Sequence, residues 1–276
     1  MPALRQCGEA LQEEGYFGKA LARWAKPLER DAALKERVVT AALDAQRGTK
    51  DYFAQVLSWC ADFMLGDKGR FGRLCALVSG AAGGNAQKID FGGFIHAASK
   101  SGNPAAFRQA AALAEKISPR ERKGKRYPER DFGGTVVSAD AMLSTSSTCS
   151  DDAPSSYPFA TDALPWDGNA FLVDWESSPW AMVTLAGECR VRGVLVVNRN
   201  PNVGRRRRQV PIEIQVSADG KEWNTVLSDD KVRDEYRADL GEKPAVAKYV
   251  RVRRVPGAKK DYFHLNKIIV YGDKLY

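Results

Sequence analysis

The sequence predicts a multidomain α + β protein, with an N-terminal array of helical hairpins followed by a C-terminal antiparallel β-sandwich. Two observations support this fold class. Apolar residues recur with the helical period of about 3.6 through residues 3–117, and with the strand period of two after residue 134. Residues 118–133 lie between these parts and hold six basic residues, two prolines and two glycines. The length of 276 residues is sufficient for two domains that each bury a core.

Residues 1–117 have the pattern of a helical repeat-like domain. Glycine-containing breaks divide this part into roughly six or seven helices. The last helix has a clear start, with Asn103 as N-cap and Pro104 at the first helical position. The segment Gly15–Leu21 resembles the core of tetratricopeptide-type repeats, which implies a surface for a protein partner. Residues 118–133 cannot form a core, so we expect an exposed basic linker there.

Residues 134–276 show the alternation of a β-sandwich with about eight short strands. Ile212, Ile214 and Val216 alternate with polar residues, as expected for strands with one buried face. Asp219-Gly220 follows this strand and predicts a hairpin with a type I′ turn. We expect Trp180 and Trp223 to lie in the core.

Six segments of this part occur in an order that resembles one family. They are Val136–Ala139, Ala160–Asp162, Ser178–Leu185, Val191–Arg199, Val216–Trp223 and Ile269–Gly272. They resemble the discoidin, or coagulation-factor C-type, domain, a galactose-binding-like jelly roll found in many bacterial carbohydrate-binding modules. The resemblance implies that residues 134–276 form one such domain and bind a ligand through the loops at one end of the sandwich.

The resemblance also implies a structural calcium site, and the sequence departs from it. Asp162 matches an early acidic ligand of the family, but Lys267 stands where the late acidic ligand is expected. An ammonium group repels calcium, which requires anionic oxygen ligands. Our hypothesis is that Lys267 faces Asp162 and replaces the metal, so the calcium site is lost and no cofactor is required.

Polar and aromatic side chains of the predicted loops are the candidate ligand contacts. An aromatic ring can cover the apolar face of a sugar, while arginine, asparagine and histidine bond its hydroxyls. The candidates are Trp166, Asp167, Asn198, Arg199, Arg208, Tyr236, Tyr262 and His264. The resemblance favours Arg199 above the others, because it places a polar contact at the end of that strand. A structural salt bridge is the alternative role for this residue.

The net charge of +8 is unevenly distributed. Residues 135–276 contain 20 Lys and Arg against 19 Asp and Glu, a net charge of +1, which leaves +7 for the rest of the chain. The run Arg205–Arg208 is therefore interpreted as a solvated hairpin tip, and a nucleic-acid partner is not expected.

The five cysteines are scattered without a C-x-x-C motif, which favours buried or idle thiols. A disulfide between Cys149 and Cys189 is the alternative. No apolar run approaches the roughly 20 residues of a membrane span. We expect a secreted, periplasmic or cell-surface protein whose export signal is absent from this sequence, with a cytoplasmic location as the alternative.

Recognisable catalytic motifs are absent from the sequence, which contains two histidines and no H-E-x-x-H, G-x-S-x-G or Walker A pattern. The sequence therefore favours a non-catalytic binding protein that captures a glycan, in bacterial adhesion or in polysaccharide or mucin-type glycan capture. Two alternatives remain. One is a structural or protein-interaction module that has lost sugar binding, and the other is the accessory end of a larger secreted carbohydrate-active enzyme.

Overall fold

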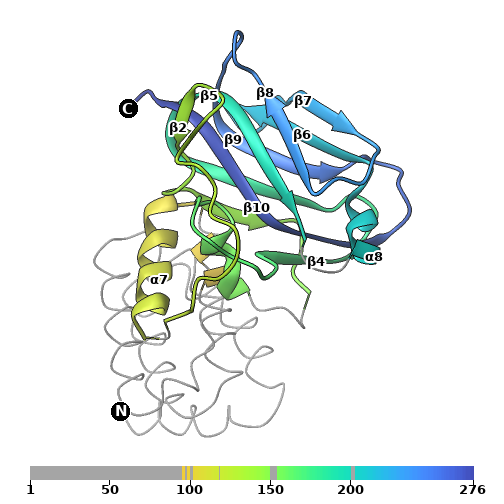
Figure 1. The fold of residues 1–276 in the computed structure, drawn as a ribbon, viewed down its shortest axis with the longest axis horizontal. Coiled ribbons are helices and arrows are strands. Elements are labelled where there is room, and N and C mark those ends of the chain that lie inside the picture. Colours follow the sequence, from red (N-terminus) through yellow and green to blue (C-terminus); the bar gives the residue numbers. More distant parts are fainter. Residues whose placement is uncertain (1–94, 97, 100–101, 118, 150–153, 200–202) are drawn as a thin grey trace, which may run out of the picture.

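The structure is a computed structural model that describes residues 95–96, 98–99, 102–117, 119–149, 154–199 and 203–276. The predicted helical array, including the tetratricopeptide-like segment Gly15–Leu21, lies outside the described residues apart from its C-terminal end. The described part is an antiparallel β-sandwich with one long helix packed against it (Figure 1).

Besides the helical residues 95–96 and 98–99, the described part contains ten strands and four helical segments. The strands are β1 (Arg130–Asp131), β2 (Gly134–Val136), β3 (Met142–Thr145), β4 (Phe171–Glu176), β5 (Trp180–Asn198), β6 (Ile212–Ser217), β7 (Asn224–Asp229), β8 (Glu235–Asp239), β9 (Ala245–Arg254) and β10 (Asp261–Lys274). The α-helices are α7 (Pro104–Ile117) and α8 (Val203–Arg206), and the 3₁₀ helices are η2 (Pro154–Phe159) and η3 (Arg207–Gln209).

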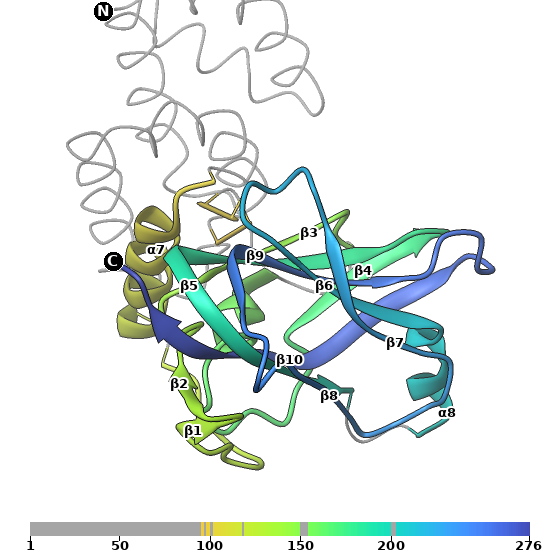
Figure 2. The same cartoon turned by 90° about the horizontal axis from the view of Figure 1, so that it is seen from above.

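The long strand β5 connects the layers of the sandwich. The main strand order is β1-β2-β10-β5-β9-β6-β7, and every strand pair that the structure describes is antiparallel. The first part of β5 pairs with β3 and β9, whereas its last part pairs with β10 and β8. The predicted β-sandwich is confirmed, and each end of it collects loops from several strands (Figure 2).

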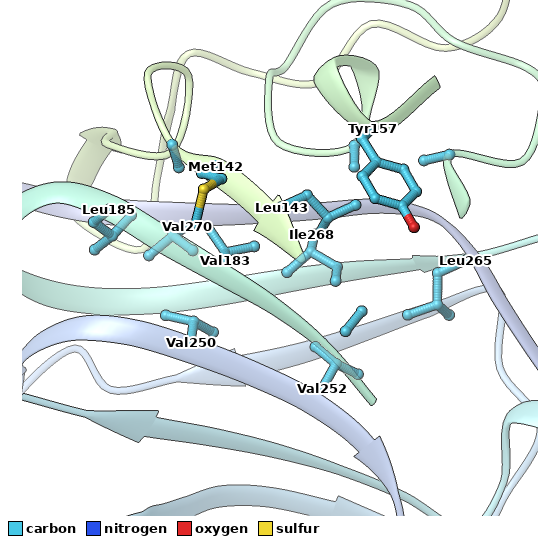
Figure 3. Close-up of a cluster of buried hydrophobic side chains, with 14 of the residues drawn as sticks. Met142, Leu143, Tyr157, Val183, Leu185, Val250, Val252, Leu265, Ile268 and Val270 are labelled. Carbon is cyan, nitrogen blue, oxygen red and sulfur yellow. The ribbon is translucent and has the colours of Figure 1, made fainter. Parts of the chain in front are cut away.

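The core lies between the layers and is built mainly from aliphatic side chains of β3, β5, β9 and β10 (Figure 3). Val183, Val250 and Ile268 are fully buried there, as the two-residue period requires of inward-facing positions. Tyr157 of η2 closes one edge of this core, and its hydroxyl lies 2.7 Å from Oγ1 of Thr145.

Helix α7 packs on the sandwich and shares its core. Asn103 Oδ1 accepts hydrogen bonds from the backbone N–H of Ala105 and Ala106, at 3.0 and 3.3 Å, so the predicted N-cap is confirmed. Phe107 belongs to the same buried cluster as the strand residues. Arg108 Nη2 donates to the carbonyl of Ala141 at 2.7 Å. The last predicted helix of the N-terminal part is thus in direct contact with the sandwich.

Most residues of the segment 119–133 are exposed, but several of its side chains attach it to the sandwich, which the composition did not indicate. Tyr127 is 5% exposed and belongs to a second buried cluster, and its backbone N–H donates to the carbonyl of Ala163 at 2.9 Å. Arg122 and Lys125 form ion pairs with Asp162 and Glu235, at 2.7 and 2.6 Å. The basic side chains therefore find acidic partners on the sandwich, which composition alone does not show.

The β6–β7 hairpin is present, but its turn differs from the prediction. Six residues, 218–223, separate the two strands, and only Gly220 has a positive φ, of +77°. Asp219 Oδ1 stabilises the loop by accepting hydrogen bonds from the N–H groups of Lys221 and Glu222, at 2.8 and 3.0 Å. This arrangement is a side-chain-capped loop rather than a type I′ turn.

Two further expectations concern side chains of the sandwich. Trp180 and Trp223 were expected in the core, but both are only half-buried. Trp223 lies under the guanidinium of Arg251, with 3.9 Å between that carbon and the ring centroid, so it packs on the outer surface of the sheet. Cys149 and Cys189 are both buried free thiols, so the alternative of a disulfide between them is wrong.

Candidate functional site

Six side chains gather at one end of the sandwich, and we call this group the arginine–aromatic patch. They are Trp175, Arg199, Arg205, Arg208, Tyr262 and His264. Five of them belong to β4, α8, η3 and β10, and Arg199 directly follows β5. Strand pairing brings them together, because the start of β10 lies beside the end of β4 and the end of β5, with Asp261 opposite Glu176 and Leu265 opposite Asn198. Helical segments α8 and η3 supply Arg205 and Arg208, and both views show α8 at the end of the sandwich away from α7 (Figures 1 and 2).

The aromatic half of the patch is formed by Trp175 and Tyr262. Their ring centroids lie 5.3 Å apart with an interplanar angle of 73°, an edge-to-face arrangement. The guanidinium carbon of Arg208 lies 5.8 Å from the ring centroid of Tyr262. Trp175 remains 51% exposed, although the burial of so large an apolar ring is favourable. An exposed ring supported from behind is a suitable surface for stacking a ligand.

The arginine half of the patch is held by a small number of polar contacts. Arg199 Nη1 lies 3.3 Å from Nε2 of His264, and Arg208 Nε lies 3.4 Å from Oδ1 of Asp261. Arg206 stabilises the same segment from below, because its Nε donates to the carbonyl of Arg199 at 2.9 Å and its Nη1 pairs with Asp234. The arginine run is therefore a helical turn and not the predicted hairpin tip, with Arg205 and Arg207 exposed and Arg206 and Arg208 half-buried.

His264 is fully buried beneath the arginine half. Its backbone N–H donates to Gln209 Oε1 at 3.0 Å. Burial, followed by the positive charges of Arg199, Arg208 and Arg205, lowers the pKa of His264 to about 3. The imidazole is therefore neutral at physiological pH.

The contact with Arg199 also determines the tautomer of His264. A guanidinium can only donate, so Nε2 must accept and Nδ1 must carry the hydrogen. Within the described part of the chain, Nδ1 has no hydrogen-bond partner. His264 thus positions Arg199 from below and does not reach the surface itself.

Three of the predicted contact residues belong to this patch as surface groups, namely Arg199, Arg208 and Tyr262. Asn198 and Tyr236 lie near it, but they act as scaffold. Asn198 Nδ2 donates to the carbonyl of Arg233 at 2.9 Å, and Tyr236 is 1% exposed with its hydroxyl against the carbonyl of Lys231. Their polar atoms serve the loop between β7 and β8.

The loop residues Trp166 and Asp167 lie in a different environment. The ring of Trp166 packs against Phe159, with centroids 4.3 Å apart, and its Nε1 donates to the carbonyl of Asn169 at 3.3 Å. Its own carbonyl accepts from Asn266 Nδ2 at 2.9 Å. Asp167 is exposed beside it. Trp166 therefore fills its loop instead of offering a free ring face.

Sequence reasoning did not find Trp175, although it is the most exposed aromatic ring of the patch. The two-residue period places Trp175 on the same face as Phe171 and Val173, which are buried. The pairing between β4 and β10 shifts register between Asp261 and Phe263, and this irregularity lies next to Trp175. An aromatic residue near the end of a strand, beyond the last buried position, is the signal that would have found it.

The residues around Asp162 do not fit a calcium ion. Lys267 is 0% exposed, and its Nζ donates to Asp162 Oδ1 at 2.7 Å and to the carbonyl of Phe159. The other carboxylate oxygen of Asp162 accepts from Arg122 at 2.7 Å. The buried ammonium thus uses the oxygen atoms that a hard cation would require. Lys267 and Asp162 form the pair expected from the sequence, while the loss of calcium binding stays a prediction.

The described residues lack two other features. No cluster of three or more His, Cys, Asp or Glu side chains in this part of the chain is arranged to hold a metal ion. No helix in the same part is long and apolar enough to cross a membrane.

One domain-family model matches part of the sandwich. The sequence model of the F5/8 type C domain matches residues 144–262. This range contains five of the six patch residues, and His264 lies just beyond it. No curated protein sequence matches the chain.

Three solved structures illustrate what the chain is similar to. A fucose-binding module from Streptococcus pneumoniae is 16% identical, with 51% of this chain and 99% of that chain covered and a TM-score of 0.41. The lectin domain of lectinolysin, complexed with Lewis b antigen, is 19% identical, with 50% and 96% covered and a TM-score of 0.40. A fucolectin from striped bass serum (Morone saxatilis) is 17% identical, with 52% and 49% covered and a TM-score of 0.41.

Proposed function

We propose that the sandwich is a non-catalytic module that binds a glycan through the arginine–aromatic patch. The observation that carries this proposal is the exposed ring of Trp175, which packs edge-to-face on Tyr262, while the Tyr262 ring also lies beside the guanidinium of Arg208. The C–H face of a sugar ring stacks on an aromatic surface, and guanidinium N–H groups bond neighbouring hydroxyls. The match of residues 144–262 to the F5/8 type C domain is consistent with a binding role.

The exposure of each side chain in the patch determines which role it has in the proposed site. Trp175 offers apolar area, Arg199 and Arg208 offer fixed donors, and His264 holds Arg199 in place. The neutral imidazole provides this support without adding a second buried charge. In this proposal the protein captures polysaccharide or mucin-type glycans outside the cell, in adhesion or scavenging, and the part that precedes the sandwich provides a scaffold.

The test is a glycan array with the full chain, followed by calorimetric titration of the best ligand. Trp175→Ala should weaken binding by about tenfold or more, because the stacking surface is lost. Tyr276→Ala is the matched control, since Tyr276 is also exposed, at 61%, but lies at the C-terminal end of the chain. If no glycan binds, or if Trp175→Ala binds with wild-type affinity, the proposal is wrong.

A further inference from the structure

We propose that the arginine–aromatic patch selects glycans that carry a carboxylate or sulfate group, an inference that rests on the glycan-binding function proposed above. A neutral sugar requires an aromatic surface and a few donors. The patch offers much more positive charge than that, and the excess is the feature that requires an explanation.

The local charge is strongly one-sided. Between Asn198 and Ile212 the chain has five arginines and no acidic residue. Two of these arginines face carboxylates, since Arg206 pairs with Asp234 and Arg208 with Asp261. Arg205 and Arg207 are exposed, and no acidic side chain of the described residues forms an ion pair with either. The surface around Arg205, near His264, therefore retains positive charge after the two ion pairs are formed.

A buried arginine adds to this charge from behind. Arg254, near the end of β9, is 5% exposed, and its Nε and Nη1 have no hydrogen-bond partner in the described part of the chain. Burial lowers the pKa of Arg254, while the charge of Asp261 acts in the opposite direction. Asp261 thus lies in the field of two guanidinium groups, Arg254 and Arg208. A single carboxylate does not neutralise both, and an unpaired buried cation is costly.

An anionic substituent on a sugar matches this arrangement better than a nucleic acid does. Residues 135–276 as a whole have a net charge of only +1, so the positive charge is confined to one end of the sandwich. A polyphosphate strand favours an extended basic groove with several stacking rings. One carboxylate or sulfate next to a ring that stacks on Trp175 needs only a local cluster of donors.

The experiment compares neutral glycans with their charged forms. The full chain is applied to an array that carries each neutral glycan beside its sialylated and sulfated derivatives, and the best pair is then titrated calorimetrically. We expect the charged form to bind at least about tenfold more tightly, and we expect its advantage to shrink as the salt concentration rises. Arg205→Gln should weaken binding of the charged form more than binding of the neutral form, so that the ratio of the two affinities falls about fivefold or more.

The control and the remaining outcomes keep the two proposals separate. Arg190→Gln is the matched control. Arg190 is an exposed arginine of β5 that lies opposite Asp273, near the C-terminal end of β10 and away from the patch. Equal affinity for neutral and charged forms would overturn this inference and leave glycan binding intact. Binding of no glycan would overturn both proposals. Tighter binding of a single-stranded oligothymidylate than of any glycan would identify a nucleic-acid interface instead.

Discussion

Removal of either partner of the buried Lys267–Asp162 pair should destabilise the sandwich, and the two losses should differ. Lys267→Met leaves Asp162 with its second ion pair, to Arg122 at 2.7 Å. Asp162→Ala leaves a fully buried ammonium with only the carbonyl of Phe159 as an acceptor. Breaking a buried pair costs about 3–5 kcal/mol, because the remaining charge loses its partner inside the protein.

The two variants should lie at opposite ends of the range of about 3–5 kcal/mol for the loss in free energy of unfolding. Lys267→Met should lower the free energy of unfolding by about 3 kcal/mol, because the remaining carboxylate stays paired. Asp162→Ala should lower it by about 5 kcal/mol, because the remaining ammonium does not. With about 2–4 °C of melting temperature for each kcal/mol in a domain of this size, the first variant should melt about 6–12 °C below the wild type.

Urea denaturation followed by tryptophan fluorescence measures both variants. Lys274→Met is the control, because Lys274 pairs with Asp140 at 3.2 Å with both side chains largely exposed, and such pairs contribute at most about 1 kcal/mol. The reasoning is refuted if Lys267→Met costs no more than this control, or if it costs more than Asp162→Ala.

Three further predictions follow from individual contacts. The pKa of His264 is about 3 in the folded protein, below its ordinary value of about 6.5, so the unfolded chain binds a proton first as the pH falls. Between pH 6 and pH 4, the free energy of unfolding of the wild-type protein should therefore fall by about 1.4 kcal/mol per pH unit relative to that of His264→Gln. Urea denaturation at several pH values measures this, and the same pH dependence in both proteins would contradict it. Gly272→Ala should cost at least about 2 kcal/mol, because a Cβ there would meet the carbonyl oxygen of Arg190 at 2.2 Å, whereas Gly241→Ala on the surface should change stability by about 0.5 kcal/mol or less. Millimolar calcium or a chelator should shift the melting temperature by less than about 1 °C, because Lys267 already uses the oxygens near Asp162, and a rise of several degrees with calcium would show that the metal still binds.

The sandwich and part of the patch could be predicted because they depend on local rules. Alternation of apolar residues identified β6 and β9, and the lysine at 267 suggested its carboxylate partner because opposite charges compensate each other. Arg199 directly follows the end of β5, where the sequence placed it, and its role as a ligand contact stays a prediction. These inferences required only sequence spacing and charge.

The remainder depends on tertiary packing that the sequence does not display. Trp166 looked exposed because its loop is polar, but Phe159 of η2 supplies an apolar partner for its ring. Tyr127 looked like part of a linker, although it joins a buried cluster of the sandwich. The alternation along β4 places Trp175 on the buried face, but the residue is exposed beside the register shift at Asp261. In each case the deciding contact comes from a segment distant in sequence or from an irregularity in strand pairing.

Strand β10 carries residues of both charge arrangements of the domain, the arginine–aromatic patch and the Lys267–Asp162 pair. Its start carries Tyr262 and His264 of the patch, and its middle carries Lys267 and Asn266. Asn266 Nδ2 donates to the carbonyls of Trp166 and Gly168, at 2.9 and 2.6 Å, so it holds the loop that precedes β4. Lys267 fixes the start of the same loop through Asp162. Both anchors are side chains of one strand, so we predict that the loop keeps its position without a bound ion. We therefore expect ligand binding at the patch to persist in the presence of a chelator, because the contacts described for Arg199 and Trp175 are made by protein groups.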